Sequence, residues 1–357
     1  MRKRLIIVII LLAGFTFVWA DPVDIYFRVS LLEELLHKQV HKWILEEDLA
    51  RSDGYIYTVD IGQIMIYFAL KGNLKGYSTL RDFAVENIIV NDPGKPFTRG
   101  FVAWRYRKGE KLDATGTTES LRIAKALWLG SQSFNRSEDR EIALLILDGY
   151  CRHSGIDQGI WFIKNYYNFT TNSFATNSFT VDYDPDFLME VADKTDHPVF
   201  KDVAIKSYEL FKDGVSPSGL FYDIIQPEVK TLFPDLNMKV FSPNDIIQLS
   251  NSCNIADTII KGDPEIALKT LNFSISQKKL YRYYYGRTGE PVTDTKAALS
   301  EYTALVELSS GLNNIKAQKD FLELVLPMWK GFYKKPYNPK LYTASEILLA
   351  IYALKEK

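Results

Sequence analysis

Helical segments in this chain are joined alternately by short links and by long, aromatic-rich links. About twelve such segments follow from the three-and-four spacing of apolar residues. The short links follow Lys71, Phe134, Asp193, Lys261 and Leu312. The long links span residues 51–58, 92–116, 156–182, 215–242, 280–293 and 330–342. Because antiparallel helices place every second connection at the same end, all the long links should gather on one face.

This alternation predicts an all-α fold, an (α/α)6 toroid in which six helical hairpins form an inner and an outer ring. Residues 30–49 are apolar along one face, whereas residues 60–71 are apolar on nearly every face. A helix that is apolar all round is buried all round, so residues 60–71 belong in the inner ring. Helix-start residue types predict inner helices that begin near Asp60, Thr117, Pro185, Asn244, Asp294 and Thr343.

The N-terminus has the pattern of a secretory signal peptide. Basic residues 2–4 precede an uncharged run over residues 5–18, and Ala20 supplies a small residue for cleavage. We predict cleavage after Ala20, a single domain over residues 21–357, and a secreted or periplasmic protein. The run is shorter than the roughly 20 residues that a membrane span needs, so we expect no stable span after processing. The alternative is an uncleaved segment that anchors the protein to a membrane.

Composition argues against several partners and chemistries. The formal net charge of −1 gives no support for nucleic acid or an anionic membrane as partner. The four histidines fall outside the long links, so histidine catalysis and zinc binding lack their residues. We therefore expect no metal and no cofactor. We also expect a monomer. Cys151 and Cys253 fall on separate predicted hairpins, so we expect two buried free thiols.

Acidic residues concentrate where the long links enter the inner helices. The candidates for catalysis are Asp60, Glu119 and Asp245, and Asp113 and Asp182 are candidates for substrate binding. Two carboxylates on either side of a bond are the minimum equipment for glycoside hydrolysis. Each acid taken singly has a bland alternative, because Asp and Glu at helix starts commonly cap the helix.

Aromatic residues make up 13% of the chain, and many of them fall in the long links. Sugar rings stack on aromatic side chains, while neighbouring polar groups bind the hydroxyls. The aromatic candidates for sugar binding are Trp104, Tyr106, Trp161, Tyr183 and Tyr222. The alternative is that these rings pack the links onto the helix ends, and we expect this of roughly half of the link aromatics.

Four segments resemble motifs of the six-hairpin glycosidases, in particular glycoside hydrolase family 8. Residues 113–128, DATGTTESLRIAKALW, are similar to the family's inner-helix signature, D-x-D-L-x-I-A-x-A-L. Residues 58–63, TVDIGQ, resemble its TVSEGQ helix start, which carries the general acid. Residues 177–187 resemble its substrate loop, and residues 242–245 resemble the segment that carries its base. The order and approximate spacing match over most of the chain beyond residue 20.

The acidic positions depart from the family pattern. In this register the catalytic Glu of the family falls on Ile61, one place after Asp60. The two acids of the D-x-D pair are replaced by Thr118 and Ser120, with Glu119 between them. A slip of one residue turns a helical side chain by about 100°, so the acids of this chain face different directions.

The acids and the resemblance together imply an exported glycoside hydrolase that acts on a β-linked or uronic-acid polysaccharide or oligosaccharide. Asp60 or Glu119 would protonate the leaving oxygen, and Asp245 would activate water or serve as the second carboxylate. Asp113 and Asp182 would orient sugar hydroxyls.

Two alternatives stay open. Ile61 at the acid position motivates a non-catalytic carbohydrate-binding or polysaccharide-assembly protein. A polysaccharide lyase is the other alternative, with Tyr as the base and Arg105 or Arg287 neutralising a uronate.

Overall fold

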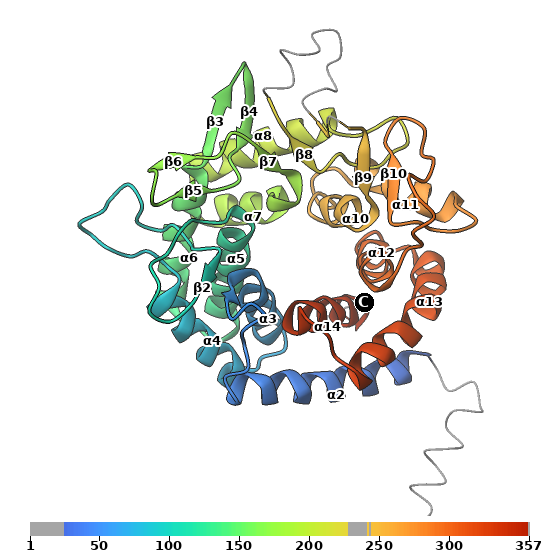
Figure 1. Ribbon diagram of the computed structural model, residues 1–357, viewed down its shortest axis with the longest axis horizontal. Helices are drawn as coiled ribbons and strands as arrows, with labels where there is room; N and C mark the ends of the chain where they lie inside the picture. The colour runs from blue at the N-terminus through green and yellow to red at the C-terminus, as the bar shows by residue number, and fades with distance from the viewer. Residues whose placement is uncertain (1–24, 228–240, 243, 356–357) are drawn as a thin grey trace, which may run out of the picture.

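The computed structural model describes residues 25–227, 241–242 and 244–355. The predicted signal peptide, its cleavage site and the alternative membrane anchor lie outside these residues. Twelve helices of the described residues form two concentric rings (Figure 1). The inner ring consists of α3 (Thr58–Leu70), α5 (Thr117–Ser133), α7 (Pro185–Thr195), α10 (Leu249–Asp257), α12 (Leu299–Gly311) and α14 (Lys340–Lys355). The outer ring consists of α2 (Ile25–Leu45), α4 (Leu74–Asn87), α6 (Ser137–Cys151), α8 (Pro198–Asp213), α11 (Pro264–Ser276) and α13 (Ile315–Lys334). The predicted (α/α)6 toroid is confirmed.

The inner ring is closed by contacts between helices far apart in sequence. α14 packs against both α12 and α3, and α3 packs against α5. The hydroxyl of Ser345 on α14 donates to the side-chain oxygen of Gln63 on α3, at 3.1 Å. On the opposite side a short 3-10 helix, η1 (Thr180–Asp182), contacts both α5 and α10. The inner helices therefore surround a central space, and side chains from each of them can meet there.

The inner helices are buried because their sequences are apolar on most faces. In α3 every residue from Asp60 to Ala69 is buried. Gly62 allows a close approach at the α3–α5 contact, because a Cβ there would lie 2.7 Å from the Cβ of Arg122. Such close packing of two helices fixes the direction of side chains along their shared seam.

Two inner helices begin later than predicted. α10 begins at Leu249 and not near Asn244, because residues 246–248 first form strand β9 (Ile246–Gln248), which pairs with β10 (Tyr283–Tyr285). α12 begins at Leu299 and not near Asp294, and the backbone N–H of Ala298 donates to the carboxylate of Glu301 at 2.9 Å.

The long links fold into small antiparallel strand pairs. Two of these pairs join neighbouring long links: β1 (Ile56–Tyr57) with β2 (Arg105–Tyr106), and β7 (Ser178–Phe179) with β8 (Ile224–Ile225). A third pair, β9 with β10, joins the segment just after the fourth long link to the fifth. Two pairs lie within the third long link: β3 (Ser154–Asp157) with β4 (Ile160–Ile163), and β5 (Tyr167–Asn168) with β6 (Ser173–Phe174). The pairing between links follows from their gathering on one face of the toroid, as predicted.

Cys151 and Cys253 are both buried and free, as expected from the sequence. Across the described ranges, no helix has the length and apolar character needed to cross a membrane.

Candidate active site

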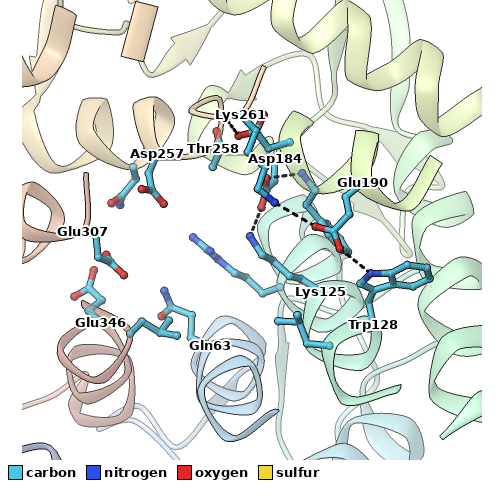
Figure 2. A pocket seen from close by; sticks show the side chains of 16 residues that line it. Gln63, Lys125, Trp128, Asp184, Glu190, Asp257, Thr258, Lys261, Glu307 and Glu346 are labelled. Atoms are coloured by element: carbon cyan, nitrogen blue, oxygen red, sulfur yellow. Dashed lines mark hydrogen bonds and ion pairs between the residues drawn. The ribbon is translucent and has the colours of Figure 1, made fainter. Parts of the chain in front are cut away.

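Among the cavities that the described residues form, three are lined by residues of the inner helices. The Glu119 cavity, about 490 Å³, lies at the entry to α5 and has among its lining residues Trp104, Asp113, Glu119, Tyr166 and Asp182. The Arg282 cavity, about 390 Å³, lies between α10, α12 and α14 and includes Gln248, Asn251, Arg282, Tyr342 and Glu346. The third cavity, which we call the lumen, is about 250 Å³ and is shown in Figure 2. All six inner helices line it, through residues that include Gln63, Arg122, Phe187, Asn254, Glu307 and Glu346.

Glu119 lies in the first turn of α5, where the second long link enters the helix. Its carboxyl group folds back over Gly116. A side chain at position 116 would collide with it, since a Cβ there would lie only 1.8 Å from Glu119 Oε2. Burial raises the pKa of Glu119 to about 8, and the negative charges of Asp182 and Asp60 add to the effect. Within the described residues no Lys, Arg or His forms an ion pair with it. Glu119 therefore holds a proton at neutral pH.

Asp182 is the second carboxylate of the Glu119 cavity. It ends η1 and accepts hydrogen bonds from the hydroxyls of Thr117, at 3.0 Å, and of Thr118, both in the first turn of α5. Burial raises the pKa of Asp182 to about 6, although the two threonine hydroxyls lower it. The cavity thus contains one carboxyl group that is protonated at pH 7 and one that is mostly ionised.

Trp104 and Asp113 form a rigid wall of the same cavity. The indole N–H of Trp104 donates to Asp113 at 2.8 Å, and the guanidinium of Arg105 donates to the other oxygen at 2.9 Å. Arg105 also stacks on the Trp104 ring, 4.2 Å from its centre. Burial opposes ionisation of Asp113, but these two donors outweigh it and lower the pKa of Asp113. The ring is held by hydrogen bonding and stacking, which suits it to bind the face of a sugar.

Asp60, predicted as a possible acid, lies beneath the site in an ion pair. Its side chain is 1% exposed, and Arg51 binds both carboxylate oxygens, at 2.6 and 3.0 Å. Burial raises the pKa of Asp60, while Arg51 lowers it. Arg51 favours the ionised form of this carboxyl group, and Asp60 is not among the residues that line the Glu119 cavity. Ile61, at the acid position of family 8, is fully buried in the core.

Asp245 lies outside the lining of the Glu119 cavity. It precedes β9 with a φ of 60°, and its carboxylate accepts a hydrogen bond of 2.6 Å from the Tyr222 hydroxyl. The Arg287 Nε atom is 4.0 Å away. The Tyr222 ring is 2% exposed, so its hydroxyl positions Asp245 while the ring packs in the core.

The remaining predicted aromatics pack into the protein. Tyr183 is 1% exposed, and its hydroxyl accepts a hydrogen bond from the Ile163 backbone N–H at 2.7 Å. Tyr106 contacts Phe83 edge to face, with ring centres 5.6 Å apart. Trp161 on β4 packs partly buried against the hydrophobic core. Trp104 is thus the one of the five predicted rings that lines the Glu119 cavity.

The lumen contains charged residues that the sequence analysis passed over. Arg122 on α5, Glu307 on α12 and Glu346 on α14 all lie within helices and away from the long links. The available signal was the presence of charged residues in inner helices that are otherwise apolar, because such helices have little surface on which to solvate a charge.

Solved structures identify the fold, whereas no protein-family model and no curated protein matches the chain. The chain is similar to an alpha-amylase from Clostridium perfringens, with a TM-score of 0.69, 15% identity, and coverage of 91% of this chain and 98% of that chain. It is also similar to a reducing-end-xylose releasing exo-oligoxylanase, with a TM-score of 0.59, 14% identity, and coverage of 85% and 83%. A third similarity, to a family 8 xylobiose complex from Teredinibacter turnerae, has a TM-score of 0.59, 14% identity, and coverage of 84% and 82%.

The fold is that of the six-hairpin glycosidases. The resemblance drawn from the sequence motifs is therefore confirmed at the level of the fold. At identities near 15%, the similarity extends to the fold alone.

Proposed function

We propose that this protein hydrolyses glycosidic bonds of a polysaccharide or oligosaccharide in the Glu119 cavity, with Glu119 as the general acid. The observation that carries the proposal is the pair of carboxyl groups in one cavity whose pKa values differ, about 8 for Glu119 and about 6 for Asp182. Carboxyl groups whose environments separate their pKa values are the usual sign of an acid and its partner.

In this mechanism Glu119 donates its proton to the leaving oxygen as the glycosidic bond breaks. Asp182, ionised at neutral pH, faces the positive charge that develops on the sugar. It either activates the attacking water as a base or attacks the sugar carbon as a nucleophile and forms a covalent glycosyl-enzyme bond. The hydroxyls of Thr117 and Thr118 orient Asp182, and each carboxylate oxygen keeps a further lone pair for the reaction. Asp245, held by the Tyr222 hydroxyl, is the alternative second carboxylate.

Trp104 and Asp113 would bind the sugar next to the reacting bond. The indole offers an apolar face for the CH groups of the ring, and Asp113 accepts hydrogen bonds from hydroxyls. This arrangement favours hydrolysis over the lyase alternative, because Arg105 already binds Asp113 and stacks on Trp104, and Arg287 lies beside Asp245 outside the Glu119 cavity. An arginine engaged in this way is poorly placed to neutralise a uronate.

The test compares Glu119→Gln, Asp182→Asn and Asp245→Asn in sugar release from α-linked maltohexaose, β-linked xylohexaose and polysaccharides. A matched control is Glu110→Gln, which alters an exposed acid of the same long link as Asp113. Removing a true acid should lower the rate by roughly 10²–10⁴ without lowering the melting temperature. Full activity in Glu119→Gln would overturn the proposal.

The non-catalytic alternative is favoured by one observation, the buried Ile61 at the family's acid position. A wild-type protein that binds these oligosaccharides but releases no sugar from any of them would establish that alternative. Titration calorimetry on the same panel separates the two functions.

We also infer that the protein is exported and processed, from the basic and apolar pattern of residues 1–20. Mass spectrometry of the secreted protein should find Asp21 at its N-terminus. An intact Met1 in the membrane fraction would support the anchored alternative, and an intact Met1 in the cytosol would refute export.

A further inference from the structure

The lumen adjoins the Arg282 cavity, which opens among the long links. The two cavities share Asn254 and Glu346 in their linings. Figure 2 shows Asp257, Glu307 and Glu346 on one side of the lumen, with Lys125 reaching toward it from the other. A molecule bound in the cleft could therefore extend into the centre of the ring.

Arg122 presents unused hydrogen-bond donors to the lumen. It lies three residues after Glu119 on α5, so both side chains leave the same side of the helix. Its Cβ packs against α3 at Gly62, which holds the base of the side chain. Within the described residues its guanidinium makes neither an ion pair nor a hydrogen bond, and it carries five N–H donors. A ligand oxygen in the lumen would find these donors free.

The opposite wall offers groups that both donate and accept. Burial raises the pKa of Glu346 to about 8, and burial likewise raises the pKa of Glu307 well above its ordinary value. A protonated carboxyl group has one O–H donor and further acceptor positions. The amides of Gln63 and Asn254 add donors and acceptors, and the Trp128 ring adds an apolar surface. Polar groups that converge beside an aromatic ring are typical of pockets that bind small polar ligands, and they can hydrogen-bond the hydroxyls of a sugar.

We propose that the lumen is a binding subsite for one terminal, uncharged sugar ring, so that the enzyme acts at the end of a saccharide chain. This inference rests on the proposed function, because it assigns the position of the substrate end relative to the Glu119 cavity. The lumen volume of about 250 Å³ falls below the roughly 300–1,000 Å³ typical of pockets for larger ligands, and so suits one ring.

The charges of the lumen select against uronic acids. Its lining includes the acids Asp184, Asp186, Glu190, Asp257, Glu307 and Glu346. The basic residues of the lining are Arg122, Lys125 and Lys261, and Lys125 is already paired with Asp184 at 2.7 Å. With Glu307 and Glu346 protonated, the four other acids still outnumber the three bases, so a sugar carboxylate would add to the negative charge of the lumen, which disfavours it. Of the β-linked and uronic-acid saccharides expected from the sequence, the subsite therefore favours those whose terminal sugar is uncharged.

The first experiment measures monosaccharide binding to the full-length protein by titration calorimetry. Glucose and xylose are the uncharged probes, and glucuronate is the charged one. Arg122→Met should weaken binding of the uncharged sugars about 10- to 100-fold, the loss expected from hydrogen bonds to a charged donor. The matched control is Arg99→Met, which removes an exposed arginine outside the lumen and should leave binding unchanged.

Glu307→Met is the second variant in case Arg122→Met fails to fold, because it keeps the approximate size of the side chain and removes both its donor and its acceptors. It should weaken binding several-fold by removing one carboxyl contact. If both folded variants bind the sugars as the wild type does, or if glucuronate binds more tightly than glucose, the lumen subsite is refuted.

The second experiment follows cleavage of a hexasaccharide that carries a label at one end. A chain-end enzyme releases a monosaccharide as its first product, and Arg122→Met should slow that release. Internal cleavage as the first event would overturn the inference and leave the proposed hydrolase function intact. Absence of all cleavage would refute the hydrolase function, and the calorimetric titration would then decide on the lumen by itself.

Discussion

Replacing Arg51 with Met should destabilise the protein strongly, although Arg51 lines neither the Glu119 cavity, the Arg282 cavity nor the lumen. Arg51 makes the bidentate ion pair with Asp60 at the start of α3. The substitution would leave a carboxylate that is 1% exposed without its partner. Breaking a buried ion pair from one side typically costs about 3–5 kcal/mol. The Arg51 side chain is 25% exposed, so solvent near it offsets part of the cost of the unpaired carboxylate. We expect the free energy of unfolding to fall by about 2–4 kcal/mol.

The expected shift in melting temperature follows from the chain length. An unfolding entropy of about 2.1 cal/mol/K per residue gives roughly 0.75 kcal/mol/K for 357 residues. A loss of about 2–4 kcal/mol then corresponds to a fall of about 3–5 °C. The double variant Arg51→Met with Asp60→Asn removes both charges and should recover much of the loss, because replacing a buried pair is far less costly than orphaning one member.

The loss should also depend on pH. Burial already raises the pKa of Asp60, and Arg51 is what lowers it, so removing Arg51 raises the pKa further. A carboxyl group with a raised folded-state pKa stabilises the fold at low pH and loses that stabilisation as the pH rises through the folded value. The melting temperatures of Arg51→Met and wild type should therefore converge as the pH falls toward 4, and separate again at neutral pH.

Thermal scans of the four proteins at several pH values, with sugar release measured in parallel, test this reasoning. The fourth protein is Asp60→Asn alone, which should lose stability and keep most of its activity. A normal melting temperature together with a rate lowered by 10² or more in Asp60→Asn would refute the structural role. It would restore Asp60 as the acid predicted from the sequence.

Three further predictions concern the Glu119 cavity. Burial raises the pKa of Glu119 to about 8, so the contribution of Glu119 to stability is complete at low pH and is lost as the pH rises through about 8. The melting temperature of Glu119→Gln should therefore exceed that of the wild type at pH 9 and equal it at pH 4. Equal melting temperatures at both pH values would contradict this. The value of kcat/KM should fall below about pH 6 and above about pH 8. If the fall near pH 6 disappears in Asp182→Asn, it belongs to the ionisation of Asp182. Trp104→Ala should weaken oligosaccharide binding about tenfold in titration calorimetry, whereas Trp161→Ala should not, and equal effects would argue against stacking on Trp104.

The ring architecture was predictable because the two kinds of helix differ in sequence. The segment over residues 60–71 has almost no polar face, and the corresponding helix α3 is buried on all sides. Local start signals succeeded at Thr117 and at Pro185, where Asp184 caps α7 by accepting from the Phe187 N–H at 3.1 Å. They failed at Asn244 and Asp294. Residue types that cap helices also begin turns. After Asn244 the chain first pairs β9 with β10, a long-range contact that local sequence does not encode.

The site was predictable only where it lies at the junction of a long link and an inner helix. Glu119 and Asp182 both have such positions, and the ring geometry brings them into one cavity. Arg122 and Glu307 lie further along their helices, where the rotation of each helix within the ring decides whether a polar side chain faces the lumen. That rotation depends on close contacts such as the one at Gly62, and a single sequence does not reveal such contacts.

Closure of the ring by α14 against α3 has a consequence for biosynthesis. The Ser345–Gln63 contact joins residues 282 positions apart, and Lys355 on α14 binds Glu33 on α2 across 322 positions. A chain made from its N-terminus exposes the side of α3 that α14 will cover until residues 340–355 have been synthesised. Loop closure over such a distance adds little to the free energy, because its entropy grows only with the logarithm of length. The delay exposes apolar surface that can associate wrongly, so chaperone binding and premature aggregation should concentrate on the uncovered side of α3.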